Sequence, residues 1–405
     1  MKRIVRYSLL IITSYLFIHP TLFAANLRWS GFGSFVMGKA TNQEPLPGGA
    51  ASTFQPDAGV PGSSNSRYKD SWSMKPDTLF GVQLNADMNE KLSATAQIIS
   101  KGAADFNAEF EWLYLSYELT PKLTLNFGRQ RVPFYYYSDF QDVGYAYHWV
   151  RPPLELYAEE LFSYEGVSAL YIDSIGGWDY EVQAYGGSGS NDATPLGDLH
   201  LKDWYGAVFI LSNDTLKFRF SLHTADVWTD GGGGLSTIST EDSPAAPKFA
   251  SLGVFYDPGV FFVGVETTYL DADILQSDAV GTTIDTRTAW MVTAGYRMGA
   301  FTPNITLSNR AVELSKDGTV TLLTPAVGAA NAELLAQPHK GAEQISQTLE
   351  IGVRWDFHPQ AAAKLSYVIR KDDSDDILID GDAVLPGAGE TLNVNVLSFG
   401  IDFIF

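Results

Sequence analysis

The sequence predicts an all-β protein, a transmembrane antiparallel β-barrel of about sixteen strands. Three observations lead to this fold class: apolar and polar residues alternate along the chain, short turns alternate with long connections, and the chain ends on an aromatic residue. In the last nine residues, LSFGIDFIF, every second residue from Leu397 to Phe405 falls on one apolar face of an extended strand. A soluble sheet can show the same alternation in a single strand, so the rest of the chain has to decide between the two.

The beginning of the chain has the features of a secretory signal peptide. Basic residues in MKRIVR precede an apolar run that ends near Ile18, and small residues follow at Ala24 and Ala25. The run is too short to cross a bilayer as a helix, which takes about 20 residues. We expect a leader over residues 1–24, cleaved after Ala24 or Ala25, and a mature barrel domain over residues 25–405.

Composition narrows the class of protein. The chain has 27 Lys and Arg against 47 Asp and Glu, and loss of the three basic leader residues changes the net charge from −20 to −23. Such acidity argues against nucleic acid as a partner. With 37 Gly, 24 Phe and no Cys, the chain resembles an exported β protein without disulfides, and thiolate metal sites and cysteine nucleophiles are excluded. The histidines show no metal-ligand spacing, so neither a metal nor a cofactor is expected.

Sixteen segments show the period-two alternation of strands. In residues 215–223, TLKFRFSLH, one face is apolar and the other carries Lys217, Arg219, Ser221 and His223. A sheet can cross a membrane only if it closes, because an open edge leaves backbone groups unpaired in hydrocarbon, and sixteen strands enclose an aqueous lumen. The predicted strands are 27–37, 78–88, 92–101, 109–119, 123–131, 164–173, 177–186, 202–211, 215–227, 248–256, 260–270, 288–298, 303–312, 344–357, 361–370 and 391–405.

The connections between these strands also alternate. Short turns such as NEK, TPK, SIG, SND, DPG, MGAF and HPQ occupy every second connection. Short turns on one rim and long loops on the other, with both chain ends on the short-turn rim, are typical of outer-membrane barrels. The longer segments are 39–76, 102–108, 132–163, 187–201, 229–247, 271–287, 313–342 and 371–389.

Three patches of sequence resemble a known family. LRWSGFGSFVMG near the mature start and SFGIDFIF at the end resemble the paired first and last strands of Gram-negative porins. Residues 128–157, GRQRVPFYYYSDFQDVGYAYHWVRPPLELY, are similar to a block that follows the fifth strand in porin-like proteins of marine and soil proteobacteria. The chain lacks the Pro-Glu-Phe-Gly-Gly type of signature that many general porins carry in the third extracellular loop.

The resemblance implies an outer-membrane channel for passive diffusion of small hydrophilic solutes and ions, assembled as a homotrimer. It also implies short periplasmic turns, long extracellular loops, contacts with outer-membrane lipid and lipopolysaccharide, and help from the barrel assembly machinery and periplasmic chaperones. An aromatic C-terminal strand resembles the signal that this machinery recognises, which gives Phe405, Phe403 and Ile401 a role as an assembly signal.

The third long segment, residues 132–163, is the expected pore constriction. At 32 residues it is too long for a simple hairpin, and its many aromatic residues argue against disorder. Five acids against one arginine give it a charge of −4. We expect it to fold into the lumen, which places these residues at the constriction: Asp139, Asp142, Arg151, Glu155, Arg129 and Arg131.

Two of these residues depend on a local irregularity. Arg129 and Arg131 share the parity of lipid-facing Leu125 and Phe127, so they reach the lumen only if a bulge at Gly128 turns them inward; otherwise they lie above the lipid band. The facing wall is expected to be basic, since these residues have lumen parity: Arg28, Lys217, Arg219, Arg297, Arg310, Arg354, Lys364 and Arg370. Opposed acidic and basic sides create a transverse field, and the acidic loops predict a modest preference for cations.

Other interpretations remain open at this stage. The aromatic residues of 132–163 could simply attach the loop to the wall, with its acids facing the outside medium. A substrate-preferring porin for anions or short sugars, a receptor or adhesin, and a barrel lipase are alternative functions; a lipase needs a Ser, His and carboxylate group, and only His223 lies in mid-strand. We expect no enzyme. Residues 370–382 are rich in Asp but lack the spacing of a calcium-binding loop, so a solvated loop is expected.

Overall fold

The structure is a computed structural model, and it describes most of the barrel. The described residues are 26–43, 68–157, 163–194, 197–230, 241–242, 244–271, 284–314, 343–374, 378–380, 383–385 and 390–405. The expected leader, residues 1–24, and its cleavage site lie outside them, as do residues 158–162 of the expected constriction segment and most of the Asp-rich loop.

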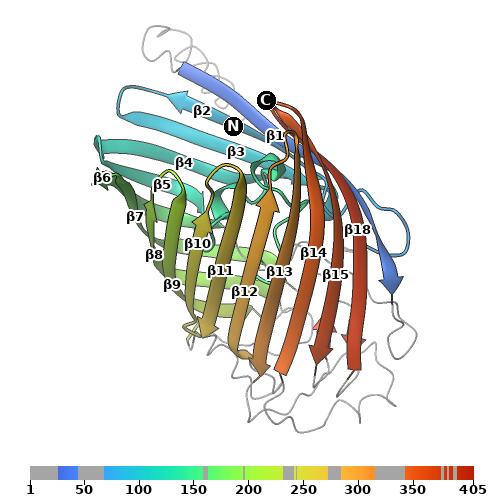
Figure 1. Cartoon of the computed structure of the whole chain (residues 1–405). Helices are drawn as coiled ribbons and strands as arrows, with labels where there is room; N and C mark the ends of the chain where they lie inside the picture. Colours follow the sequence, from blue (N-terminus) through green and yellow to red (C-terminus); the bar gives the residue numbers. More distant parts are fainter. Residues whose placement is uncertain are drawn as a thin grey trace, which may run out of the picture.

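Sixteen antiparallel strands close into one barrel, and all sixteen predicted strands are confirmed (Figure 1). The order around the barrel is β1-β18-β15-β14 and then down to β2, which pairs with β1. The barrel strands are β1 (Asn26–Gln43), β2 (Leu79–Asp87), β3 (Leu92–Lys101), β4 (Ala108–Thr120), β5 (Leu123–Arg131), β6 (Ser163–Ile175), β7 (Trp178–Thr194), β8 (Gly197–Ser212), β9 (Leu216–Asp230), β10 (Lys248–Tyr256), β11 (Phe261–Asp271), β12 (Ile284–Tyr296), β13 (Phe301–Leu314), β14 (Glu343–His358), β15 (Ala361–Ser374) and β18 (Glu390–Ile404).

The remaining elements are small. Strands β16 (Leu378–Asp380) and β17 (Ala383–Leu385) pair only with each other. Three single 3₁₀ turns follow β3 and β5, namely η1 (Gly102–Ala104), η2 (Ser138–Phe140) and η3 (Gly144–Ala146). In the described part of the chain, no helix is long and apolar enough to cross a membrane.

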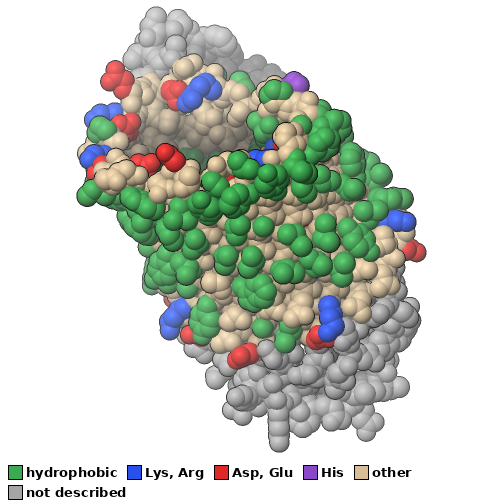
Figure 2. Space-filling model, in the orientation of Figure 1, with side chains coloured by type: hydrophobic (Ala, Val, Ile, Leu, Met, Phe, Trp, Pro, Cys, Tyr) green, Lys and Arg blue, Asp and Glu red, His purple; other side chains and the backbone are tan. Residues whose placement is uncertain are grey.

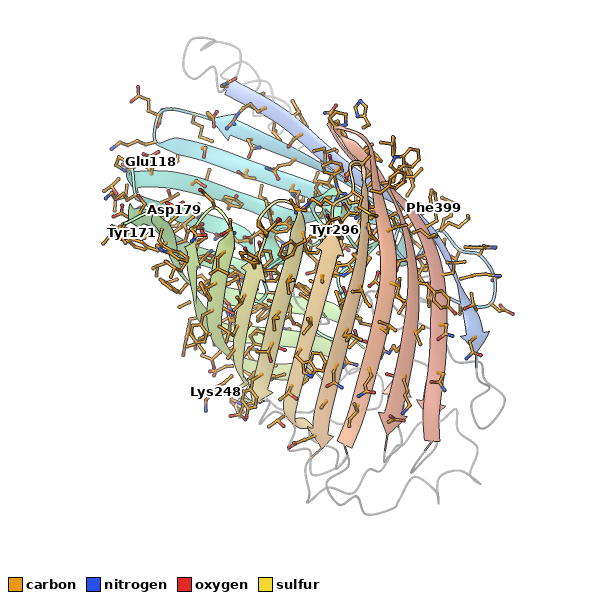
Figure 3. The ribbon with its side chains drawn as sticks, in the orientation of Figure 1. Glu118, Tyr171, Asp179, Lys248, Tyr296 and Phe399 are labelled. Atoms are coloured by element: carbon orange, nitrogen blue, oxygen red, sulfur yellow. The ribbon has the colours of Figure 1, made fainter. Side chains whose placement is uncertain are left out.

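The outer surface of the barrel is an apolar belt, seen in Figure 2 as green side chains around its flank. The alternation is clear in β12, where Trp290 and Val292 are exposed while Met291 and Thr293 are buried. Aromatic residues are exposed close to the short turns, as expected for an interfacial girdle; they include Trp29, Tyr117, Tyr296, Trp355 and Phe357. Figure 3 shows Glu118, Tyr171 and Asp179 at that rim and Lys248 at the opposite one. The outer surface therefore suits a membrane-spanning barrel.

The seam between β1 and β18 is fixed by aromatic rings that lie over glycines. Phe405 and Gly31 exchange two backbone hydrogen bonds of 2.9 and 3.0 Å, and Gly33 lies opposite Phe403. A Cβ atom on either glycine would overlap the ring of its partner. The ring of Phe405 also stacks on Phe80 with centroids 6.0 Å apart. The last residue of the chain is thus part of barrel closure.

Deleting Phe405 is expected to weaken this closure. The deletion removes the two hydrogen bonds and the stacked ring, so the free energy of unfolding should fall by about 2–3 kcal/mol. Urea unfolding in lipid vesicles measures this change, and the heat-modifiable mobility of cell-made protein measures the folded yield. Phe209→Ala, which removes an exposed ring on β8, is the control. Equal stability and yield after deletion would contradict a closing role for Phe405.

Candidate functional site

Residues 132–157, here called the inner loop, lie inside the barrel. The loop contacts the inner wall at successive strands: Tyr136 N donates to Glu266 on β11 (2.8 Å), and His148 Nε2 lies 2.8 Å from Thr293 Oγ1 on β12. Farther along, Trp149 Nε1 donates to Thr306 Oγ1 on β13 (2.7 Å). These contacts place the loop across the lumen, as its length and composition predict, and not over the outer rim.

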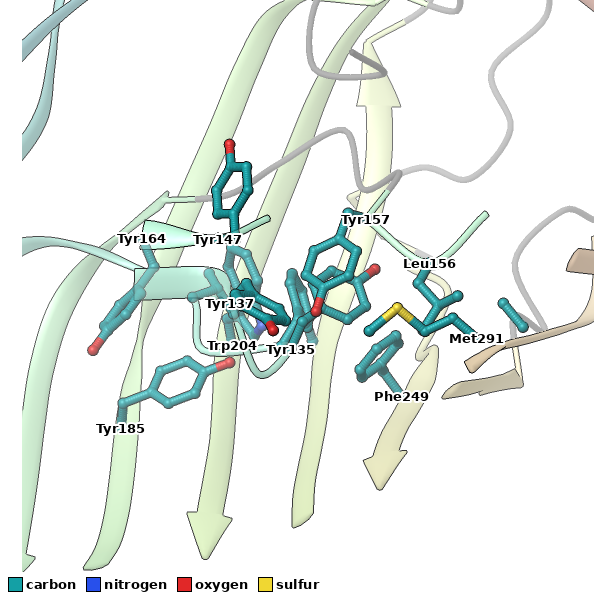
Figure 4. Close-up of a cluster of buried hydrophobic side chains, with 14 of the residues drawn as sticks. Tyr135, Tyr137, Tyr147, Leu156, Tyr157, Tyr164, Tyr185, Trp204, Phe249 and Met291 are labelled. Atoms are coloured by element: carbon teal, nitrogen blue, oxygen red, sulfur yellow. The ribbon is translucent and has the colours of Figure 1, made fainter. Parts of the chain in front are cut away.

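Aromatic residues hold the inner loop against one part of the wall. Phe134 packs edge-on against His223 of β9 and Phe249 of β10, with both centroid distances 4.9 Å, and Tyr136 stacks on Phe255 at 3.7 Å. Figure 4 shows this buried cluster, in which Tyr135, Tyr137 and Tyr157 of the loop lie near Phe249 and Met291 of the wall. Residues 134–137, FYYY, are therefore part of a packed core. This explains why the inner loop has more aromatic residues than a solvated loop would have.

Basic side chains of the wall donate to the backbone of the inner loop. Arg219 binds the carbonyl oxygens of Phe134 (2.9 Å) and Pro133. Arg354 binds those of Tyr145 and Tyr147, both at 2.7 Å. An irregular buried segment has carbonyl groups that no strand partner satisfies, and these guanidinium groups supply the missing donors. Two of the residues predicted to line the lumen thus hold the loop in place.

Lys364 joins the inner loop to the closing strand. Its ammonium group donates to the carbonyl oxygens of Gly144 and Trp149, both at 2.6 Å, and forms a 2.8 Å ion pair with Asp402 of β18. Asp402 also accepts from Ser34 Oγ on β1 at 2.5 Å, and the side chains of the ion pair are each 1% exposed. Removing one member of such a pair leaves an uncompensated buried charge, so this contact ties loop position to barrel closure.

Two acids predicted at the constriction are buried and paired. Asp142 forms ion pairs with Arg131 (2.5 Å) and Lys101 (3.1 Å). Burial opposes ionisation of Asp142, but these two cations outweigh it and hold the pKa of the carboxyl below its usual range. Glu155 accepts from Ser308 Oγ (2.7 Å) and Thr348 Oγ1 (2.6 Å). Both carboxylates therefore stabilise the docked loop.

The prediction for Arg129 is wrong, because it lies on the outer face. Its guanidinium pairs with exposed Glu165 at 3.4 Å, and the pairing of β5 with β6 runs without a bulge past Gly128. Gly128 instead adopts a φ of 131° within a continuous strand. Arg131 does reach the interior, because it is the last residue of β5 and the chain turns inward there, where it meets Glu111 at 3.0 Å.

The remaining basic residues do not form one continuous wall. Arg28 and Arg297 lie at the short-turn rim in exposed ion pairs with Asp87 (3.0 Å) and Asp257 (2.6 Å). Arg310 is a partly exposed residue of lumen parity on β13, and it has no ion pair with any described residue.

Three other predicted residues have contacts of their own. Arg151 of the loop donates to the carbonyl oxygen of Asp77 and pairs with its carboxylate at 3.4 Å. Lys217 lies 5.3 Å from the ring centroid of Tyr136, and Arg370 pairs with Asp372 at 2.9 Å. The basic residues predicted to oppose an acidic loop therefore have different roles. Some bind the loop, some lie at the short-turn rim, and some pair with neighbouring side chains.

An open cavity of about 300 Å³ lies between the inner loop and strands β4 to β8. Asp139 of the loop is exposed toward it, and Glu181 on β7 faces it; neither has an ion pair with a described residue. Among the described residues that line the cavity, Arg131 is the one basic side chain, and it is bound by Glu111 and Asp142. The lining residues are Trp112, Tyr114, Asn126, Gln130, Arg131, Asp139, Leu170, Glu181, Gln183, Val208 and Ile210. Figure 2 shows the barrel hollowed at its short-turn rim, on this side of the molecule.

Docking of the inner loop should weaken as the pH falls below about 6.5. Burial, followed by the charges of Lys364, Arg354 and Arg297, holds the pKa of His148 well below its usual range. In an undocked loop the imidazole has an ordinary pKa of about 6.5, so acid protonates the undocked form first. The docking free energy should fall by up to about 1.4 kcal/mol per pH unit until the docked imidazole titrates.

Hydrogen exchange of peptides from residues 132–157, between pH 7 and pH 4.5, measures this effect. Their protection should decrease in the parent protein and much less in His148→Gln, which cannot gain a charge. The carboxyl of Asp142 contributes only below its ordinary pKa of about 3.9, outside this window. Identical pH profiles for the two proteins would show that His148 does not control docking.

The chain is similar to known proteins in its structure but not in its sequence. No protein-family model matches the chain, and no curated protein sequence matches it. Among solved structures, it is similar to the outer membrane channel DcaP of Acinetobacter baumannii, with 13% identity over 94% of this chain and 97% of that one and a TM-score of 0.56. The anion-selective porin from Comamonas acidovorans shows 12% identity, 94% and 100% coverage and a TM-score of 0.53.

A third similar structure is outer-membrane expressed OmpT of Vibrio cholerae, with 13% identity, 94% and 98% coverage and a TM-score of 0.54. Identities this low establish the fold and not the activity. The match nevertheless extends over nearly the whole length of each of these proteins, and all sixteen barrel strands of this chain are antiparallel and closed. By its closed barrel and by these similarities, the chain has the sixteen-stranded fold of the outer-membrane porins.

Proposed function

We propose that the protein is an outer-membrane channel for passive diffusion of small hydrophilic solutes and ions. The observation that carries this proposal is the open cavity, lined by both polar and apolar side chains, that the inner loop leaves beside strands β4 to β8. The apolar belt and the fold shared with a known channel, DcaP, support it. The proposal includes export through the leader at residues 1–24 and cleavage after Ala24 or Ala25.

The channel should prefer cations modestly. Asp139 and Glu181 line the cavity without ion pairs to described residues, whereas Arg131 is bound by two carboxylates. An ion in the cavity passes both acids within the Debye length of about 8 Å, so their field acts on it directly. Arg310 on the far wall acts in the opposite sense. The anion selectivity of the Comamonas porin is a property of that protein.

Replacing the two unpaired acids tests this assignment. Asp139→Asn with Glu181→Gln should move the reversal potential in a KCl gradient toward that of chloride and reduce cation conductance. The matched control, Glu241→Gln with Asp242→Asn, removes the same two charges from an exposed loop and should have a much smaller effect. A parent channel that already prefers anions would refute the assignment, as would an unchanged reversal potential in the Asp139 and Glu181 variant.

We also propose a homotrimer, joined near the seam. Phe35, Met37 and Phe399 are exposed on the outer faces of β1 and β18, where an apolar patch continues from one strand to the next. Three copies that bury this patch should stay together in mild detergent and separate on boiling. Light scattering with correction for bound detergent measures the mass, and a monomer mass would contradict the proposal.

Other functions receive less support from the site. His223, the candidate base of a lipase, has its Nδ1 2.7 Å from the hydroxyl of Tyr185, and its Nε2 is buried without a partner among the described residues. His223 is not among the residues that line the open cavity, and its hydrogen bond goes to a tyrosine, so it does not form the Ser–His pair that lipid hydrolysis needs. A receptor or adhesin would show no conductance in bilayer recordings. Recognition of Phe405, Phe403 and Ile401 by the assembly machinery, and contacts with chaperones and lipopolysaccharide, remain proposals that follow from the fold.

A further inference from the structure

We infer that residues 142–147 of the inner loop, here called the strap, bind across the seam between β1 and β18, so that the loop docks completely only when the barrel has closed. β1 and β18 are the first and last strands of the barrel, and Figure 1 shows them side by side. Their pairing joins the two ends of the chain. In a sheet that has not closed, they are its opposite edges. The strap acts in this way whether or not the barrel conducts ions.

On one side of the seam, the strap binds strands from the end of the chain. Lys364 on β15 donates to the carbonyl oxygen of Gly144 (2.6 Å), and Arg354 on β14 donates to that of Tyr145 (2.7 Å). The hydroxyl of Tyr145 donates to the carbonyl oxygen of Pro359, in the turn between these two strands, at 2.7 Å. These contacts attach the strap to β14 and β15.

On the other side of the seam, the strap contacts strands from the beginning of the chain. Asp142 pairs with Lys101, the last residue of β3, at 3.1 Å, and Val143 packs against a buried cluster that includes Phe32 of β1. Through the closed seam, β3 and β15 are four strands apart, about 19 Å at about 4.8 Å per strand. Along an open sheet they are twelve strands apart, about 58 Å. Six residues span at most about 21 Å, so the strap can reach both strands only through a closed seam.

The strap comes closest to the wall at two residues that meet across the seam. Ser34 of β1 and Asp402 of β18 are directly opposed, and Ser34 Oγ donates to Asp402 Oδ1 at 2.5 Å. Gly144 lies against both, because an added Cβ atom would overlap the carboxylate of Asp402 and the hydroxyl of Ser34. Lys364, which binds the Gly144 carbonyl, pairs with the same carboxylate at 2.8 Å. The surface that receives Gly144 is therefore complete only when both strands are in place.

Another part of the inner loop is attached without the seam. Phe134 packs on β9 and β10, Tyr136 stacks on Phe255 of β10, and Tyr136 N donates to Glu266 of β11. These three strands are consecutive and lie in the middle of the strand order, so this attachment can form before closure. Docking of the strap, by contrast, depends on both edges. Strap docking and seam closure therefore stabilise each other by the same factor, as linkage requires.

Hydrogen exchange of the folded protein in lipid nanodiscs tests this coupling. Gly144→Ala forces an overlap at the seam, so the protection of residues 142–147 should fall about tenfold. The protection of β1 and β18 should fall by a similar factor, whereas β7 should keep the protection of the parent protein. The matched control is Gly186→Ala on β7, where an added Cβ atom lies 3.8 Å from its nearest neighbour, the carbonyl oxygen of Trp204. It should leave the strap and the seam unchanged.

The reverse experiment starts at the seam. Deletion of Phe405 weakens closure without removing any strap contact described above. Residues 142–147 should then lose protection, while residues 134–137, which the aromatic cluster holds, should keep it. Tyr145→Phe is a milder second variant, to be used if Gly144→Ala does not fold. It removes only the hydrogen bond to Pro359 and should lower the protection of strap and seam together, about threefold.

Three outcomes would overturn the strap. Equal loss of protection at residues 134–137 and 142–147 after deletion of Phe405 would mean that the loop docks as one unit. Exposure of the strap in Gly144→Ala with full protection of β1 and β18 would mean that the strap does not hold the seam. A uniform loss in every strand, β7 included, would mean general destabilisation without coupling. Coupled changes in a barrel that conducts no ions would support the strap and refute only the proposed channel.

Discussion

The requirement that backbone polar groups be paired away from water shapes both the wall and the interior of this protein. A sheet can meet it in lipid only as a closed barrel, because every strand then has two partners. The same requirement applies to the irregular inner loop, which is buried against the inner wall of the barrel and cannot form a ladder. Arg219, Arg354 and Lys364 meet it by donating to loop carbonyl oxygens. The first role of these three basic residues is therefore to hold the loop in place.

The interior of the barrel is asymmetric, because some strands bind the inner loop more than others do. Strands β9 to β15 carry the arginines that bind loop carbonyl oxygens, and Lys364 of β15 forms the buried ion pair with Asp402 of β18. The aromatic cluster extends farther, because it also includes Tyr164 of β6, Tyr185 of β7 and Trp204 of β8. Strands β4 to β8 also border the open cavity, with amides, aromatic rings and Glu181. Because Arg219, Arg354 and Lys364 are already bound to the loop, we propose that the field in the cavity depends mainly on unpaired groups such as Asp139 and Glu181.

The sequence predicted the strands well and the site only in part, for a physical reason. Period-two alternation is local and is imposed by lipid on every strand, so all sixteen strands could be read from it. The inward course of the loop also followed from its length and aromatic content. The pairing of Asp142 and Glu155, by contrast, depends on tertiary contacts with β3, β5, β13 and β14. Nothing local in the sequence shows which part of the wall the loop leaves open, so the residues that line the cavity could not be predicted.

The glycines of β1 have a meaning for folding that goes beyond the space they provide. Alternation excludes a slip of one residue at the seam, because it would turn apolar side chains inward, but a slip of two keeps every face correct. Shape makes the remaining choice: in the native register the rings of Phe403 and Phe405 lie over Gly33 and Gly31. Two residues one way, Phe403 would meet Phe35; two the other way, Phe405 would meet Trp29. The fit of these rings over the two glycines therefore favours the native alignment over a slip of two residues when the barrel closes.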